Sequence, residues 1–138
     1  MQTPFEGIWV PIITPFRGDT IDHPALARLA QYLASNGIAG LVAGATTGEG
    51  ALLHPGEQEA IFATLRAAVP GLPIALGLSH SSTQLAAEMA KRMATWQPDG
   101  LLVTAPPYVR PSQQGIRRHF EAIADHDLQH SLPHQRQH

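Results

Sequence analysis

A glycine-rich segment, Gly44-Ala45-Thr46-Thr47-Gly48-Glu49-Gly50, separates an apolar run at residues 38–43 from a helical pattern that begins near Pro55. The apolar run has the length of a buried strand, so the segment is predicted to be a loop between a strand and a helix. Glycines allow close approach to the backbone, and successive N–H groups in such a turn can hold an anion. Two interpretations stay open: a cradle for a small carboxylate with hydroxyls from Thr46 and Thr47, or a tight turn whose threonines satisfy local backbone groups.

The order of strand, loop and helix recurs four times along the chain. Further apolar strand patterns stand at residues 8–13, 73–78 and 101–104, although Pro11 weakens the first because proline cannot donate to a ladder. Helical patterns follow the four strands: one capped by Asp22 and ended by Asn36-Gly37, one between Pro55 and Pro70-Gly71, one after residues 79–83, and one over residues 112–124. This alternation predicts an α/β protein with a parallel sheet.

Two architectures fit that alternation. One is an open doubly wound sheet; the other is a partial TIM (β/α)8 barrel of about four βα units, since a complete barrel typically needs about 250 residues. A half barrel is expected to leave open sheet edges at its first and fourth strands and an uncovered apolar interior.

The composition excludes several classes of protein. Hydrophobic residues make up 43% of the chain, and with a net charge of -2 no nucleic-acid partner is predicted. No apolar run is long enough to cross a membrane and no signal peptide is recognisable, so a cytoplasmic protein without a membrane partner is expected. The absence of cysteine excludes disulfides, thiolate metal ligands and a cysteine nucleophile.

The loop after the fourth strand pattern carries the second candidate group. It reads Ala105-Pro106-Pro107-Tyr108-Val109-Arg110-Pro111, and its prolines stiffen the backbone that presents Tyr108 and Arg110. Ligands bind beyond the carboxyl ends of parallel strands, so Thr46, Thr47 and Tyr108 are expected to share one rim. A threonine–tyrosine pair within hydrogen-bond reach can relay a proton. A packed aromatic residue on a rigid turn is the alternative.

Histidine and lysine add no predicted site. Four histidines recur every fourth residue and could line a helix face as metal ligands: His126, His130, His134 and His138. Pro133 interrupts such a helix, so no metal is predicted. His80 fits either the rim or a capping turn. Lys91, the one lysine in the sequence, is expected at the solvated surface of a helix.

Three motifs together resemble those of the dihydrodipicolinate synthase/N-acetylneuraminate lyase family. They are Thr14-Pro15-Phe16, Ala45-Thr46-Thr47-Gly48-Glu49 and Pro107-Tyr108-Val109-Arg110-Pro111-Ser112-Gln113, and the resemblance runs from about Gly7 to Asp125. It implies a (β/α)8 barrel, a homo-oligomer, and class I aldolase chemistry without a cofactor. In that chemistry pyruvate or another 2-keto acid forms a Schiff base with a barrel lysine and is joined to, or released from, an aldehyde.

The resemblance also assigns roles by position. Thr46, Thr47 and Gly48 would bind the keto-acid carboxylate, and Thr46 and Tyr108 would act in a proton relay, with Tyr108 serving a neighbouring subunit's site. Two departures from the family pattern matter. Ala45 replaces a usual glycine, which is expected to alter the backbone of the loop. Pro107-Tyr108-Val109 replaces Tyr-Tyr-Asn, which indicates a different aldehyde or keto acid.

The family's fifth-strand tyrosine and sixth-strand lysine have no counterpart in this sequence. Residues 1–125 therefore correspond to the N-terminal half of a lyase barrel, and the chain is expected to be catalytically inactive. A non-catalytic half-barrel dimer that binds a small carboxylate is the alternative. Residues 126–138 are expected to be an aberrant, disordered tail. Shifting the reading frame there by one nucleotide permits Ile-Tyr-Asn-Ile-Pro, which resembles the family's fifth strand and suggests a frameshift near residue 126.

Overall fold

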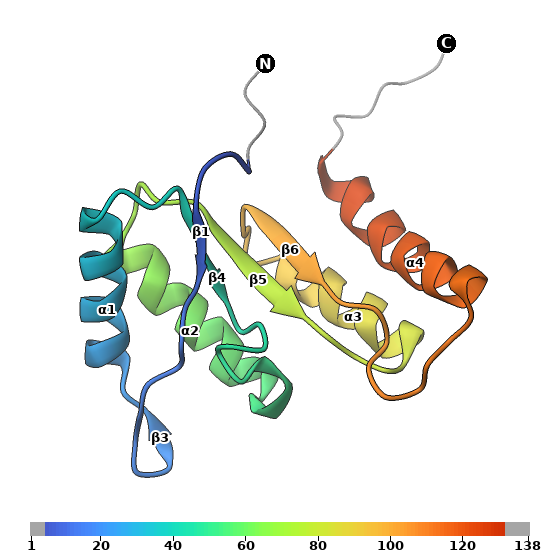
Figure 1. Cartoon of the computed structure of the whole chain (residues 1–138), viewed down its shortest axis with the longest axis horizontal. Coiled ribbons are helices and arrows are strands. Elements are labelled where there is room, and N and C mark those ends of the chain that lie inside the picture. Colours follow the sequence, from blue (N-terminus) through green and yellow to red (C-terminus); the bar gives the residue numbers. More distant parts are fainter. Residues whose placement is uncertain (1–4, 132–138) are drawn as a thin grey trace. The chain divides into compact units, whose positions relative to one another are not determined.

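The computed structural model describes residues 5–131, with side chains described as far as Asp125 (Figure 1). The four strand–helix units predicted from the sequence are present. The elements, in chain order, are β1 (Trp9–Pro11), β2 (Phe16–Arg17), β3 (Thr20–Ile21), α1 (His23–Ser35), β4 (Gly40–Ala43), the 3-10 helix η1 (Gly50–Leu52), α2 (Pro55–Ala68), β5 (Ile74–Leu78), α3 (Thr83–Ala94), β6 (Gly100–Val103) and α4 (Gln113–Ser131).

The main sheet has the order β1-β4-β5-β6, and the pairs β1–β4 and β4–β5 are parallel. Pro11 lies within β1 without losing a ladder bond. The Ile8 carbonyl accepts from Ala39 N at 2.7 Å and Ile12 N donates to the Val42 carbonyl at 3.0 Å, so these residues face β4. The backbone groups of Pro11, which lies between them in the alternation, therefore face the open edge, where a missing N–H is tolerated.

The chain forms two compact units: Met1–Gly77 with Pro98–Leu102, and Leu78–Gln97 with Val103–His138. In the first unit α1 and α2 lie side by side and pack over the strands (Figure 1). Its core consists of fully buried aliphatic side chains from the strands and both helices: Leu26, Ala30, Leu41, Ile61, Leu65 and Ile74. In the second unit α3 packs on α4, and Ala86, Ala90 and Met93 are buried there.

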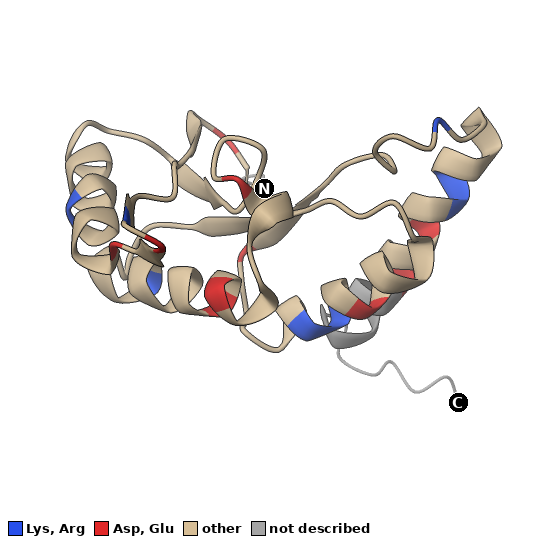
Figure 2. Cartoon of the chain, turned by 90° about the horizontal axis from the view of Figure 1, so that it is seen from below, with Lys and Arg blue, Asp and Glu red and all other residues tan. Residues whose placement is uncertain are grey.

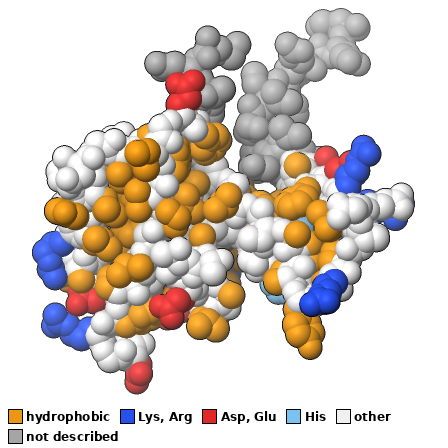
Figure 3. All heavy atoms as spheres, in the orientation of Figure 1, with side chains coloured by type: hydrophobic (Ala, Val, Ile, Leu, Met, Phe, Trp, Pro, Cys, Tyr) orange, Lys and Arg blue, Asp and Glu red, His pale blue; other side chains and the backbone are white. Residues whose placement is uncertain are grey.

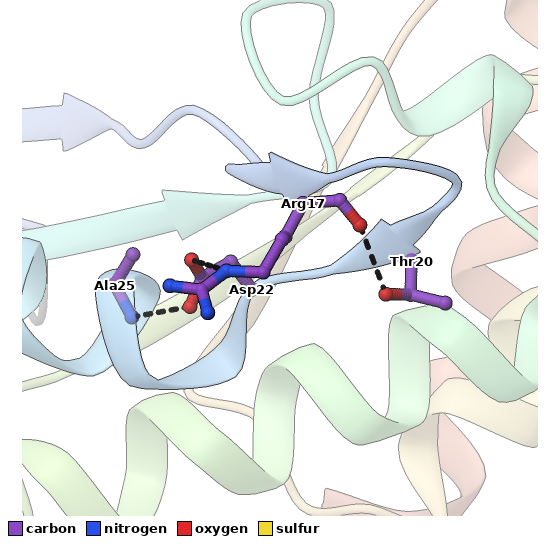
Figure 4. Close-up of polar contacts among 4 residues, drawn as sticks. All are labelled: Arg17, Thr20, Asp22 and Ala25. Atoms are coloured by element: carbon purple, nitrogen blue, oxygen red, sulfur yellow. Dashed lines mark hydrogen bonds and ion pairs between the residues drawn. The ribbon is translucent and has the colours of Figure 1, made fainter.

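Asp22 caps the start of α1, as the sequence predicts, and the short β2–β3 hairpin contacts this cap. The Asp22 carboxylate accepts a hydrogen bond from Ala25 N at 3.0 Å, as expected of an N-cap residue (Figure 4). Arg17, on the β2–β3 hairpin, lies 3.4 Å from the same carboxylate, and its carbonyl accepts from the Thr20 hydroxyl. The sequence predicted the turn at residues 17–20 but not the two short strands that flank it.

The exposed sheet edges are confirmed at the outer strands. Ile8 is 71% exposed, Ile13 51% and Leu102 50%. Apolar side chains form a broad area on the face of the first unit drawn in Figure 3. The expected uncovered interior is wrong for the two inner strands, because every residue of β4 and β5 is buried. The rings of Phe5 and Trp9, tilted by 47° with centroids 5.1 Å apart, lie against Gly100 and Gly40 at the start of β6 and β4.

Helix α4 continues past its predicted end near residue 124 and reaches Ser131. The expectation of an irregular tail is therefore wrong for residues 126–131. The reason is that no helix-breaking residue occurs before Pro133. Residues 132–138, which include His134 and His138, lie outside the described residues, and the proposed frameshift stays a prediction for the nucleotide sequence to test.

Candidate functional site

The loop of residues 44–50 lies at the carboxyl end of β4, as the sequence predicted. Its backbone closes on itself: Gly50 N donates to the Ala45 carbonyl at 3.0 Å and Glu49 N to the Thr46 carbonyl at 3.1 Å. Gly44 and Glu49 both have positive φ, +66° and +56°. The buried hydroxyl of Thr14, which follows β1, donates to the Gly48 carbonyl at 2.7 Å. A buried hydrogen bond from the segment after β1 therefore holds this loop in place.

The surface of the loop presents donors. Thr46 and Thr47 are exposed, whereas Gly48 and Gly50 are buried. Within the described part of the chain no hydrogen bond is shown for the backbone N–H groups of Thr46, Thr47 and Gly48. Three successive N–H groups and two hydroxyls suit an anion more than a neutral ligand.

The loop packs so closely on β5 that glycine is required at two positions. A Cβ added at Gly77 would lie 2.5 Å from the Gly44 carbonyl oxygen and 2.6 Å from the Ala45 backbone. A Cβ at Gly50 would collide with the same Gly44 carbonyl. The loop is thus fixed by backbone against backbone, with little room for it to relax.

Tyr108 belongs to the second unit and is 99% exposed, so the interpretation as a packed aromatic residue is wrong there. Its φ is +71°, and Val109 N donates to the Pro107 carbonyl at 2.9 Å across it. A bond between residues two apart around a central residue of positive φ is a γ-turn of the rare, strained kind. Arg110 also has a positive φ, +44°. The shared rim of Thr46, Thr47 and Tyr108 stays a prediction.

The remaining candidates from the sequence lie on exposed positions. His80 is exposed, and its Nδ1 accepts from Ser82 N at 3.0 Å, which is the capping-turn arrangement. Lys91 is exposed on α3, as predicted. Among the described residues no group of three or more histidine, aspartate or glutamate side chains could hold a metal ion. Acidic and basic residues are interspersed along the helices (Figure 2).

His119 is a buried polar residue that the sequence reading did not single out. It lies on α4, is 1% exposed, and its Nδ1 is 2.9 Å from the Thr83 hydroxyl on α3. Its Nε2 has no hydrogen-bond partner in the described part of the chain. The signal was available: His119 falls between Ile116 and Ile123 at helical spacing, on the stripe that a helix buries.

Burial makes His119 sensitive to acid. Desolvation lowers the pKa of the ring from its ordinary 6.5. The backbone of Thr104 raises this pKa, and the nearby charge of His80 lowers it. The neutral ring is therefore favoured in the folded state, and its stabilisation is complete above pH 6.5 and is lost as the pH falls through the folded pKa. We expect the free energy of unfolding to decline below pH 6.5, and to decline less in His119→Leu, in urea titrations at several pH values. Equal slopes for the two proteins would contradict this.

The described residues contain no helix that combines the length and the apolar character needed to span a membrane.

The chain matches the Dihydrodipicolinate synthetase family over residues 4–133. The 4-hydroxy-tetrahydrodipicolinate synthase of Syntrophus aciditrophicus (strain SB) is 38% identical over 122 residues, which are 88% of this chain and 42% of the relative. The synthase of Prochlorococcus marinus (strain MIT 9303) is 41% identical over 124 residues, which are 88% of this chain and 41% of the relative.

Solved structures give the same result. The crystal structure of dihydrodipicolinate synthase from Cyanidioschyzon merolae with lysine bound has a TM-score of 0.86 and 35% identity, and the match covers 91% of this chain and 43% of that one. The synthase from Thermotoga maritima has a TM-score of 0.86 and 29% identity, covering 89% and 42%. The chain thus spans well under half the length of these relatives. With its parallel sheet and alternating helices it has the fold of part of a (β/α)8 barrel, and it belongs to the dihydrodipicolinate synthetase family.

Proposed function

We propose that this chain carries the carboxylate-binding part of a 2-keto-acid lyase site. The observation that carries the proposal is the loop after β4, where the N–H groups of Thr46, Thr47 and Gly48 show no hydrogen bond within the described residues and both threonines are exposed. The carboxylate of pyruvate is a small anion that accepts several hydrogen bonds, so it fits this set of donors. The site class comes from the family, whose named members are 4-hydroxy-tetrahydrodipicolinate synthases.

The chain alone is proposed not to carry out the covalent step. A Schiff-base lysine must be desolvated and must lie beside the reacting carbonyl. Lys91 is the one lysine of this sequence and is exposed on α3. The amine nucleophile would have to come from a segment beyond these 138 residues.

Tyr108 is proposed to act with Thr46 in a proton relay, serving the site of a neighbouring subunit. Two observations support this role. The side chain is almost fully exposed, so it is free to reach into another chain. It also projects from a strained turn, and strained backbone of this kind is found most often at functional sites.

Pyruvate titration tests the carboxylate site. We expect wild-type chain to bind pyruvate saturably and to bind its methyl ester, which lacks the anionic charge, far more weakly. Thr47→Val removes one hydroxyl at nearly constant volume and should raise the Kd about tenfold, the effect of one hydrogen bond to a charged group. Thr20→Val, on the β2–β3 hairpin of the same unit, is the control and should leave the Kd unchanged. Equal binding of the acid and the ester would rule the proposal out.

A half-barrel dimer that binds a small carboxylate without turning it over is the second candidate. The exposed apolar side chains at the outer strands, Ile8 and Ile13 beside β1 and Leu102 on β6, favour it. Two copies of four strands provide the eight that a closed barrel contains. Sedimentation equilibrium should then show a dimer that Ile13→Lys converts to monomer, whereas a wild-type monomer at high concentration would exclude this candidate.

A further inference from the structure

The turn that presents Tyr108 is held by a side chain from a different loop. The Pro107 carbonyl closes the γ-turn by accepting from Val109 N at 2.9 Å. The same carbonyl accepts from the Ser81 hydroxyl at 2.8 Å. Ser81 lies in the loop between β5 and α3, twenty-six residues earlier in the chain. A carbonyl oxygen has two lone pairs, so both bonds form at once without competing.

The loop that contains Ser81 is itself fixed at several points, so it can act as a support. The Thr104 hydroxyl, at the end of β6, donates to the Ser79 hydroxyl at 2.8 Å. Thr104 N donates to the Leu78 carbonyl at 3.1 Å. On the other side of Ser81, Ser82 caps α3 by accepting from Leu85 N. Residues on both sides of Ser81 are therefore restrained, which gives its hydroxyl a defined position.

Beneath this loop the buried ring of His119 joins α4 to the first residue of α3. Its Nδ1 is 2.9 Å from the Thr83 hydroxyl, and Thr83 follows the Ser82 cap directly. The start of α3, which follows the loop that contains Ser81, is thus tied to the core of the second unit. All of these contacts lie within that unit.

The need for such a support follows from the backbone of the Tyr108 loop. Tyr108 and Arg110 both have positive φ, a conformation that residues with a Cβ adopt only when their surroundings impose it. Tyr108 itself is 99% exposed and receives no packing that would impose it. The hydrogen bond from Ser81 is the contact from outside the turn that reaches the closing carbonyl.

We infer that Ser81 is a positioning residue for Tyr108: its hydroxyl holds the Pro107 carbonyl, and so fixes the direction in which the tyrosine leaves the turn. The inference rests on the proposed function for the use that is made of Tyr108, because the proton relay requires a defined direction. The geometry of the turn, however, can be measured in the chain without any substrate.

Amide hydrogen exchange and tyrosine resonances of the full chain test this inference. Ser81→Ala should speed exchange of the Val109 amide at least about fivefold, the effect of one neutral hydrogen bond, and should shift the ring resonances of Tyr108. Ser81→Thr keeps the hydroxyl and should restore both values. Ser112→Ala is the control: it removes the cap that accepts from Gly115 N at the far end of the same loop, and should leave the Val109 amide unchanged.

Two results would overturn the inference. One is Val109 exchange and Tyr108 resonances that do not change in Ser81→Ala. The other is an acceleration that extends equally to the amides of α3 and α4, because Ser81 would then stabilise the whole unit rather than direct Tyr108. Neither result depends on pyruvate. Loss of the carboxylate site in the titration with pyruvate would leave the role of Ser81 standing, and the reverse also holds.

Discussion

Gly50→Ala is expected to destabilise the first unit by about 3 kcal/mol, the upper end of the usual range for overpacking. The new Cβ would collide with the carbonyl of Gly44. Neither partner in this collision is a flexible side chain, so the loop can relieve it only by leaving its closed conformation. The Gly50 N–H bond to the Ala45 carbonyl would then be lost, and the proposed carboxylate site on this loop would be lost with it. Urea unfolding and pyruvate titration should both report the change.

Gly56→Ala provides the matched control for that substitution. Gly56 lies in the first turn of α2, and its added Cβ would have only an ordinary contact of 3.7 Å with His54 Nδ1. Alanine in place of glycine at a compatible helical position stabilises by about 0.4–1 kcal/mol. The two variants should therefore move stability in opposite directions. If Gly50→Ala proves as mild as Gly56→Ala, the loop is not held by backbone contact in the way described.

The second large effect concerns the covalent step: the chain is expected to form no Schiff base with pyruvate. Incubation of the chain with pyruvate and borohydride is expected to leave Lys91 unmodified, because its side chain is exposed on α3 and lacks the desolvated environment that a Schiff-base amine requires. Borohydride reduces a Schiff base to a stable amine, so even a small population of adduct would accumulate. Peptide mass spectrometry then measures the modified fraction.

A full-length synthase of the family, treated in the same way, provides the positive control for trapping. Lys91→Arg separates specific from background labelling, since any signal at residue 91 must disappear in that variant. A pyruvate adduct on Lys91 that saturates at low pyruvate concentration would contradict the proposal that this chain lacks the amine nucleophile.

Much of the fold could be predicted from short-range patterns. The Asp22 cap, the Asn36-Gly37 end of α1 and the start of α2 at Pro55 are local signals, and the structure confirms them. The covering of β4 and β5 was missed because it depends on contacts between distant segments, such as the 44–50 loop against Gly77. The end of α4 was placed too early because the composition changes after Asp125 whereas the first helix breaker comes only at Pro133.

For the candidate site, too, local patterns could be predicted from the sequence and long-range contacts could not. The glycine and threonine pattern located the loop after β4, and motif order was enough to place it in a family. The sequence could not show that Thr14 holds the Gly48 carbonyl, or that Ser81 holds the turn at Tyr108, because those bonds join residues 34 and 26 positions apart. The sequence predicts no role for His119, although its spacing from Ile116 and Ile123 places it on the apolar stripe of the helix.

The central claim is that the loop after β4 binds the carboxylate of a 2-keto acid. Amide chemical-shift mapping of the full chain during pyruvate titration tests it most directly. If this loop binds the carboxylate, saturable shifts are expected on Thr46, Thr47 and Gly48, whose N–H groups show no partner within the described residues. These shifts should be absent with the methyl ester. Saturable shifts centred on any other part of the chain, with residues 44–50 unmoved, would contradict it.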